Sequence, residues 1–261
     1  MGIVNATGNS FSEGAESDPA SALDRALALM DNGADIIDIG AESTRPGAGE
    51  VPPLQESAVV EKLLKQLYAV RPDAVVSVDT RNALTAKVSL ELGVKYINDV
   101  SMLSHDDKMA ETVAGYDAAL VLCHSRGTPQ NMQEKRFCSY PGGVVEEVSY
   151  ELSAAAEKAV SMGVKKENII FDPGFGFAKD NEQQLTMLRR AAEFCRLGRT
   201  LAGLSRKSFL GALTGEKIPA ERTGATLAAE IQLAECGIDI IRTHRTGFLR
   251  DALIIKQLLR V

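Results

Sequence analysis

Short runs of apolar residues recur along the chain, and longer segments with helical spacing of apolar positions separate them. The eight runs are rich in Val, Ile and Leu and show almost no alternation of polar and apolar residues. Such continuity is typical of parallel strands that are covered on both faces of a sheet. The predicted strands cover residues 2–5, 35–40, 74–79, 94–99, 118–124, 168–172, 200–205 and 238–244.

The segments between these runs have the periodicity of amphipathic helices. In residues 54–70, for example, Val60, Leu63, Leu64 and Leu67 recur at three- and four-residue intervals, which places them on one helical face. The predicted helices cover residues 19–31, 54–70, 82–92, 105–114, 143–161, 182–196, 221–235 and 248–259.

Eight alternations of strand and helix in 261 residues predict an α/β fold, the (β/α)8 TIM barrel. We expect one domain spanning residues 1–261, because no linker or low-complexity segment interrupts the pattern. The alternative is a doubly wound open sheet, which usually has fewer strands and a topological switch point.

Composition narrows the class of partner. The net charge is −6 and no Lys/Arg run occurs, which argues against nucleic acid as a main partner. No apolar run approaches the length of about 18 residues that a membrane span needs. The four cysteines form no C-x-x-C pair and no signal-peptide pattern opens the chain, so we expect free thiols and a cytoplasmic protein.

Nearly every apolar run ends in a hydrogen-bonding or ionisable residue. The carboxyl ends of barrel strands carry the chemistry in TIM-barrel enzymes, so we predict that these residues form one polar floor. Asp99 and Arg206 could instead be structural ion-pair residues. The strand-end residues are Asn5, Glu42, Asp79, Asn98, Asp99, His124, Asp172, Ser205, Arg206, Lys207, Arg242 and His244.

Four of these residues suit a flat heterocycle with amino and ring N–H donors on one edge and a carbonyl on another. Asp79 and Asp172 accept hydrogen bonds, Asn98 both donates and accepts, and Lys207 only donates. Read alone, Asp172 could simply start a turn before Pro173. The recurrence of such endings at several strands favours a binding site.

Positive residues near the same strand ends suit a phosphate group. Arg45, Arg242 and His244 supply charge, and Ser208 opens a short helical stretch whose N-terminus would attract an anion. The Gly- and Pro-rich residues 43–49 could clamp a phosphate or could be a plain surface loop. The chain contains no zinc-binding, G-x-S-x-G or G-x-G-x-x-G pattern.

Several segments together resemble the dihydropteroate synthases. They include "MGIVNATGNSFSEG", "DIIDIGAESTRPGA", "IIFDPGFGFAKDNEQQL" and "GLSRKSFLG", and they occur in order along nearly the whole chain. The resemblance implies a TIM barrel, usually dimeric and Mg²⁺-dependent, in a family that sulfonamides target. It also implies condensation of 6-hydroxymethyl-7,8-dihydropterin pyrophosphate with 4-aminobenzoate, giving 7,8-dihydropteroate and pyrophosphate for folate synthesis.

The resemblance also implies roles for individual residues. Asp79, Asn98, Asp172 and Lys207 would bind the pterin, and Asn5 would lie at the Mg²⁺. Pyrophosphate would be held by Arg45, Arg242 and His244. The aminobenzoate would be bounded by Phe11, Thr44, Pro46, Phe177, Lys207 and Ser208, and Ser205 would also contact substrate.

Two other classes of protein remain possible from the sequence. One is a non-catalytic pterin-binding paralogue, and the other is a pterin-binding methyltransferase barrel that works with a corrinoid partner. "SRKSFLG" and the "STRPG" segment both favour the synthase.

Overall fold

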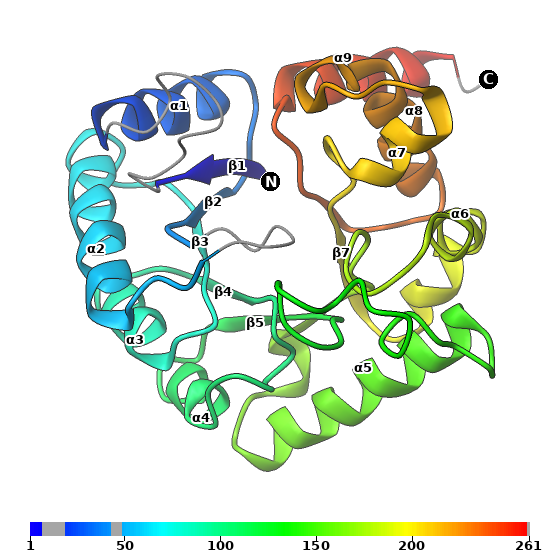
Figure 1. Ribbon diagram of the computed structural model, residues 1–261. Helices are drawn as coiled ribbons and strands as arrows, with labels where there is room; N and C mark the ends of the chain where they lie inside the picture. The colour runs from blue at the N-terminus through cyan, green and yellow to red at the C-terminus, as the bar shows by residue number, and fades with distance from the viewer. Residues whose placement is uncertain (7–18, 43–48, 260–261) are drawn as a thin grey trace.

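The eight strands form one parallel sheet that closes into a barrel (Figure 1). The computed structural model describes residues 1–6, 19–42 and 49–259. Each strand pairs with the next along the chain, and a parallel bridge between Thr243 and Gly2 brings the end of the sheet back to its beginning. The Ile3 amide donates to the Thr243 carbonyl at 3.0 Å across this closure. The predicted TIM barrel is therefore confirmed.

The strands and helices alternate as predicted, with small differences in length. The strands are β1 (Gly2–Asn5), β2 (Ile37–Gly40), β3 (Val76–Asp79), β4 (Tyr96–Asp99), β5 (Ala119–Cys123), β6 (Ile169–Asp172), β7 (Arg199–Ala202) and β8 (Ile240–Ile241). The helices are α1 (Pro19–Asp31), α2 (Pro53–Val70), α3 (Ala83–Glu91), α4 (Met109–Ala114), α5 (Val144–Ser161), α6 (Asn181–Arg189), α7 (Ser208–Thr214), α8 (Thr223–Glu235) and α9 (Thr246–Leu258). Three 3₁₀ turns complete the set: η1 (Lys166–Asn168), η2 (Ala191–Arg196) and η3 (Pro219–Glu221).

Several predicted elements differ from the observed ones in length, and two differ most. The helix predicted over 182–196 divides into α6 and η2, because the chain tightens after Arg190 and the Glu193 amide bonds the Arg190 carbonyl. The strand predicted over 238–244 is only two residues long, so Arg242 and His244 lie beyond its end. The shortening of β8 lies at the boundaries of the predicted strand, where apolar periodicity gives little information.

The barrel has two apolar cores. The larger one lies between the strands and the surrounding helices. The smaller one consists of Met1, Val121, Ile170, Leu201 and Ile240, which come from the strands alone and the residue before them, so it fills the barrel interior. Side chains alternate along a strand, so the residues two positions after Val121 and Ile170 also face the interior, nearer the carboxyl end.

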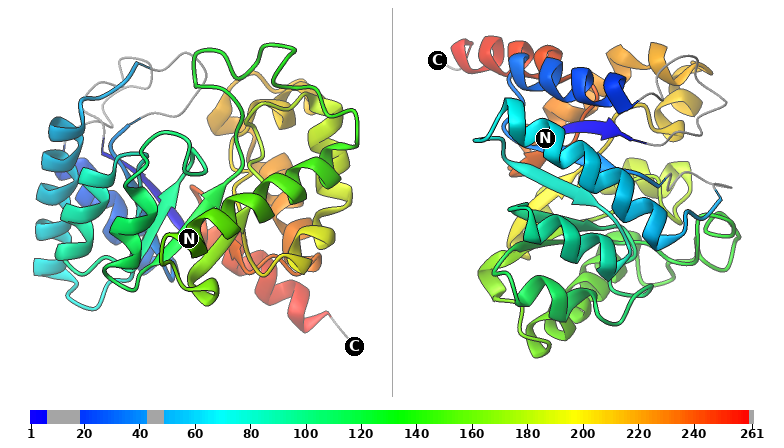
Figure 2. Two further views of the ribbon diagram at one scale, coloured as in Figure 1. Left: turned by 90° about the horizontal axis from the view of Figure 1, so that it is seen from below. Right: turned by 90° about the vertical axis from the view of Figure 1, so that its left-hand side faces the viewer.

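The loops that follow the strands gather at one end of the barrel (Figure 2). In the left panel this end is at the top, and helices surround the strands on the outside. None of the helices within the described ranges is long and apolar enough to cross a membrane. All four cysteines are free thiols, as predicted.

Candidate active site

The polar strand ends of β3, β4 and β6 lie together at the mouth of the barrel. Asp79 and Asn98 face each other in the register of β3 and β4. Asp172 lies opposite Cys123 in the register of β5 and β6. Asp79, Asn98 and Asp172 are only 8%, 2% and 7% exposed. The barrel thus gathers three of the predicted pterin-binding residues in one buried layer.

Arg242 joins two carboxylates in this layer. Its Nε donates to Asp38 Oδ2 at 2.5 Å and its Nη2 donates to Asp79 Oδ2 at 2.8 Å. Asn98 Nδ2 also donates to Asp38 Oδ2, at 3.3 Å. Asp38 is fully buried and was not predicted as a site residue, although a charge inside an apolar run was the available signal.

The charged groups of the layer shift one another's pKa values. Burial raises the pKa of Asp79 to about 7, with Arg242 opposing the shift and Asp38 adding to it. Burial also raises the pKa of Asp172 and lowers the pKa of Lys207. Three carboxylates therefore share two cations, Arg242 and Lys207, and one more donor group would be stabilised among them.

Two buried acceptors of this layer have no partner within the described part of the chain. They are Asn98 Oδ1 and Asp38 Oδ1. Buried polar atoms in proteins are nearly always hydrogen bonded, and exceptions call for an explanation such as a ligand or water. The layer can thus accept hydrogen bonds from a ligand that carries N–H groups.

The glycines after Asp172 are required by the geometry of their loop. Asp172 Oδ1 accepts from the Gly174 amide at 2.8 Å, which is the turn that Asp before Pro predicts. Gly174 and Gly176 have φ values of 69° and 86°. A Cβ on Gly174 would lie 1.9 Å from the His124 carbonyl oxygen. The loop therefore passes closer to the end of β5 than any other residue type would allow.

Lys207, which follows the neighbouring strand β7, lies against this loop. Its Nζ is 4.4 Å from the centre of the Phe177 ring, a distance at which a cation and an aromatic face attract. Lys207 is also the N-cap residue of α7. Ser208, the first residue of that helix, is exposed. Four predicted site residues from β6, β7 and their loops thus lie near one another: Asp172, Phe177, Lys207 and Ser208.

His244 contacts the loop that follows β7. Its Nδ1 lies 2.9 Å from Ser205 Oγ, and its backbone amide donates to the same oxygen at 3.2 Å. Ser205 therefore fixes both the ring and the backbone of His244. Arg242, two residues earlier, reaches instead toward β2 and β3.

The remaining predicted residues are placed less fully. Asn5 is exposed at the end of β1. Phe11, Thr44, Arg45 and Pro46 lie outside the described residues.

Asp99 has a structural role, as the alternative interpretation of the sequence allowed. Its two carboxylate oxygens accept from the backbone amides of Ser101 and Leu103 and from the Ser101 hydroxyl. Asp99 therefore stabilises the turn after β4.

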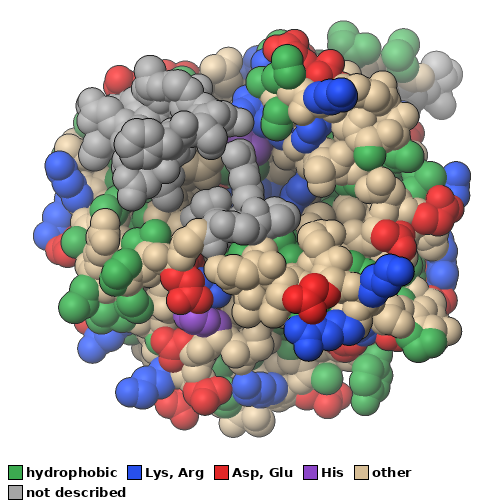
Figure 3. Space-filling view, in the orientation of Figure 1, with side chains coloured by type: hydrophobic (Ala, Val, Ile, Leu, Met, Phe, Trp, Pro, Cys, Tyr) green, Lys and Arg blue, Asp and Glu red, His purple; other side chains and the backbone are tan. Residues whose placement is uncertain are grey.

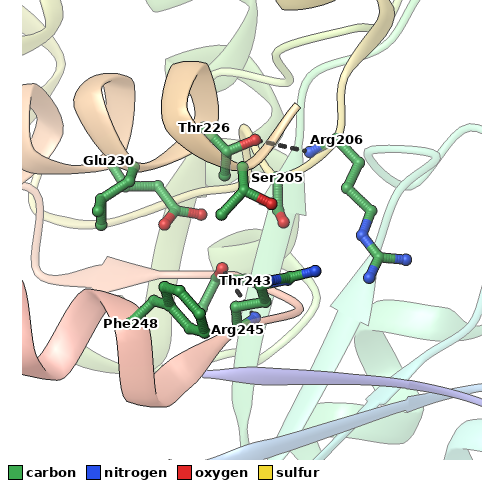
Figure 4. A pocket seen from close by; sticks show the side chains of 9 residues that line it. Ser205, Arg206, Thr226, Glu230, Thr243, Arg245 and Phe248 are labelled. Carbon is green, nitrogen blue, oxygen red and sulfur yellow. Dashed lines mark hydrogen bonds between the residues drawn. The ribbon is translucent and has the colours of Figure 1, made fainter. Parts of the chain in front are cut away.

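A second acid near the mouth was not predicted. Figure 4 shows Glu230 and Thr226 of α8 and Ser205 lining a small cavity, with Phe248 of α9 on the other side, while the Thr226 hydroxyl accepts from the Arg206 amide. Burial raises the pKa of Glu230 to about 7. In the sequence it is one of several acids in a helical pattern, so no signal distinguished it.

The surface around the mouth carries charges of both signs. On the face shown in Figure 3, acidic and basic side chains are interspersed rather than gathered by sign. A hollow opens beside Phe177, between the loops that follow β3, β4 and β5. It is lined by Arg81, Val100, Ser101, Ser104, His105, Ser125, Gly127, Thr128, Pro129, Met132 and Phe177. The site thus continues from the buried layer to an open hollow.

Comparison with known proteins identifies the class to which this barrel belongs. The family model described as "Pterin binding enzyme" matches residues 1–244, and the chain belongs to this family. Its relatives of similar length are dihydropteroate synthases, which confirms the resemblance found in the sequence. The Synechocystis enzyme is 39% identical over 94% of this chain and 84% of its own length. The Streptococcus pyogenes enzyme is 36% identical over 99% and 95%.

Solved structures agree with these relatives. Xanthomonas albilineans dihydropteroate synthase with 4-aminobenzoic acid has a TM-score of 0.90 and 34% identity, covering 100% of this chain and 92% of that one. The same enzyme with 7,8-dihydropteroate has a TM-score of 0.87 and 32% identity, covering 100% and 93%. This chain spans only 34% of the longer Schizosaccharomyces pombe folic acid synthesis protein fol1, to which it is 38% identical.

Proposed function

We propose that this protein is a dihydropteroate synthase. It would join 6-hydroxymethyl-7,8-dihydropterin pyrophosphate to 4-aminobenzoate, releasing 7,8-dihydropteroate and pyrophosphate. The observation that carries the proposal is the buried layer of Asp79, Asn98 and Asp172, in which Asn98 Oδ1 has no partner among the described residues and the two carboxylates act on the charge of Lys207. A pterin offers amino and ring N–H donors to the acceptors and a carbonyl to Lys207.

The reaction replaces one bond at the pterin methylene by another. The aminobenzoate nitrogen attacks the methylene carbon, and the carbon–oxygen bond to pyrophosphate breaks. The electron pair of that bond leaves with pyrophosphate, and the nitrogen loses one proton to solvent. We assign the pyrophosphate to Arg242 and His244, which offer positive charge and hydrogen-bond donors. Arg242 already uses Nε and Nη2 for its carboxylate partners, so Nη1 is the group assigned to the leaving oxygens.

The direct test is release of pyrophosphate with and without 4-aminobenzoate. We expect release that depends on both substrates and forms dihydropteroate in equal amount. A pterin-binding paralogue would bind the pterin and release nothing. A methyltransferase barrel would release nothing and would transfer a methyl group only with a corrinoid partner. Absence of release by a folded protein that binds both substrates would overturn the proposal.

We also propose that Mg²⁺ binds with the substrate rather than to the protein alone. In the ranges that the structure describes, no group of three or more His, Cys, Asp or Glu side chains could hold a metal. Mg²⁺ keeps several waters and often binds through one or two protein oxygens and substrate phosphates. The exposed amide oxygen of Asn5 fits such a set, and the ion would neutralise charge on the leaving pyrophosphate.

Mg²⁺ binding is therefore expected to require pyrophosphate. Calorimetry should detect no Mg²⁺ binding to the protein alone and clear binding when inorganic pyrophosphate is present. Replacing Asn5 by alanine should raise the Mg²⁺ concentration for half-maximal activity, because one oxygen ligand is lost. Replacing the half-buried Asn168, whose amide bonds Asp117 before the start of β6, should leave it unchanged. Tight binding of Mg²⁺ to the substrate-free protein would contradict this assignment.

The resemblance also supports a cytoplasmic homodimer as a proposal. Large apolar side chains are exposed on α7 and α9, including Leu213 at 51%, Phe248 at 54% and Leu258 at 74%. The free cysteines suit a reducing compartment. Sedimentation equilibrium would test the proposal, with a dimer as the expected species.

A further inference from the structure

A buried lysine, Lys179, lies behind the loop that joins β6 to α6. Its side chain is only 1% exposed. Lysine is rarely buried to this extent, because an ammonium group removed from water must be hydrogen bonded. The reaction proposed above gives Lys179 no role.

The ammonium group of Lys179 has three partners at hydrogen-bond distance. Nζ lies 3.0 Å from His124 Nδ1, 3.0 Å from the Gly174 carbonyl oxygen and 2.9 Å from the Phe177 carbonyl oxygen. A lysine ammonium has three donors and no acceptor. The three partners therefore match the three protons of the charged form, although burial lowers the pKa of Lys179 to about 7.

His124 is held in the tautomer that Lys179 needs. Nδ1 must accept from Lys179, so the ring proton is assigned to Nε2. Nε2 lies 3.0 Å from Glu151 Oε2, and burial lowers the pKa of His124 to about 4, which keeps the ring neutral. Although burial acts against it, hydrogen bonds from His124 and Arg126 lower the pKa of Glu151 to about 2. Glu151 is thus a fixed acceptor for His124.

The loop in front of Lys179 has a backbone that needs external support. Gly174, Gly176 and Ala178 have φ values of 69°, 86° and 48°. Left-handed backbone is unfavourable for alanine and persists only where the surroundings hold it in place. Gln184 Oε1 accepts from the Gly176 amide at 2.9 Å, whereas Lys179 bonds carbonyls near both ends of the loop.

The position of this loop decides where Lys207 lies. A Cβ on Gly176 would lie 2.8 Å from Lys207 Cδ, so the lysine stem crosses the glycine. The Phe177 ring is 4.4 Å from Lys207 Nζ. A shift of the loop would therefore move Phe177 and Lys207 together.

We propose that Lys179 is a positioning residue for pterin binding, which holds the carbonyls of Gly174 and Phe177 and thereby places Phe177 and Lys207. The inference rests on the proposed function, because it takes Lys207 and Asp172 as the pterin site. It adds a residue that acts through the loop and does not touch the ligand.

The replacement of Lys179 by methionine tests this role, since methionine has similar length and no donor. Calorimetry would measure the affinities of 6-hydroxymethylpterin and, separately, of inorganic pyrophosphate with Mg²⁺. We expect pterin affinity to fall about 10-fold or more, because charge-assisted hydrogen bonds to the loop are lost. Pyrophosphate affinity should stay unchanged, because Arg242 and His244 lie on another loop. A general loss of structure would lower both affinities.

Lys158→Met is the matched control, because Lys158 Nζ donates to the Leu103 carbonyl at 3.1 Å, away from the loop. It should leave both affinities at the native values.

If Lys179→Met does not fold, a pair of variants at His124 tests the same inference. His124→Asn retains an acceptor near the position of Nδ1 and should bind pterin better than His124→Leu, which has none.

The outcomes separate this inference from the proposed function. If the native protein does not bind pterin, the inference about Lys179 and the proposed function are both wrong. If the native protein binds pterin and Lys179→Met binds it equally well, the inference is wrong and the function stands. Equal losses for pterin and pyrophosphate in Lys179→Met, or equal pterin affinities of the two His124 variants, would also overturn the inference.

Discussion

Replacing Arg242 by alanine is expected to abolish most of the activity and to destabilise the protein. The guanidinium group is the partner of two buried carboxylates, Asp38 and Asp79. Removing one partner of a buried ion pair costs about 3–5 kcal/mol, because the other charge stays buried and unpaired. Proton uptake by Asp79, whose pKa is raised to about 7, should reduce this cost.

The loss of stability should therefore depend on pH. Below pH 7 Asp79 is largely protonated in both proteins, so its contribution to the difference in unfolding free energy is small. Above pH 7 Asp79 ionises beside Arg242 in the native protein but has lost that partner in the variant, so the difference grows. Denaturant unfolding at pH 6 and pH 8 would measure it. Arg71→Ala, which removes an exposed ion pair with Asp31, is the control and should change little at either pH.

The loss of activity in Arg242→Ala should follow from the leaving group. Removing one preorganised donor from developing negative charge commonly costs about 10²- to 10³-fold in rate. The variant should also bind the pterin pyrophosphate far less tightly, with a smaller loss for bare hydroxymethylpterin. Adding Asp38→Asn to Arg242→Ala should restore stability but not activity. Equal losses of affinity for the two ligands would contradict the assignment of Arg242 to pyrophosphate.

Replacing Asp172 by asparagine is expected to weaken pterin binding and leave the fold intact. The asparagine oxygen can still accept from the Gly174 amide, which Asp172 Oδ1 does at 2.8 Å. The second carboxylate oxygen, however, becomes an amide donor that faces the donors of the pterin. The loss of a charged acceptor should cost about 1.5–3 kcal/mol, which is roughly 10- to 150-fold in affinity.

Calorimetry with a pterin analogue would measure the effect. Asp79→Asn should act in the same direction. The control is Asp180→Asn, because Asp180 also accepts from a backbone amide, that of Gln183, but at the exposed start of α6. If the Asp172→Asn and Asp79→Asn variants both bind the pterin analogue with native affinity, the assignment of these residues to the pterin is wrong.

The barrel and part of its site could be predicted because they depend on local pattern. Continuous apolar runs mark buried parallel strands, and their carboxyl ends meet at one mouth in a closed barrel. This rule alone predicts that Asp79, Asn98 and Asp172 lie together at the mouth of the barrel. Boundaries were less certain, as the two-residue strand β8 shows, because hydrogen bonding to neighbours ends a strand before its apolar pattern does.

The partners of these residues could not be read from the sequence. Asp38 and Arg242 are 204 residues apart in the chain, and only closure of the barrel brings them together. Lys179 and His124 are 55 residues apart. Lysine beside two acidic residues in "AKDNE" resembles a surface residue, and its burial appears only when the loop after β6 packs against β5.

The sequence by itself determined the barrel, the end of it that carries the site and the chemical types that line that end. These are consequences of strand direction and side-chain periodicity, which are local properties of the chain. Only the tertiary structure decided which charges share a buried layer, which protonation states they favour, and which lysine contacts ligand and which holds a loop. Those properties depend on burial and on distances between residues from different strands, because the energy of a charge is set by its surroundings.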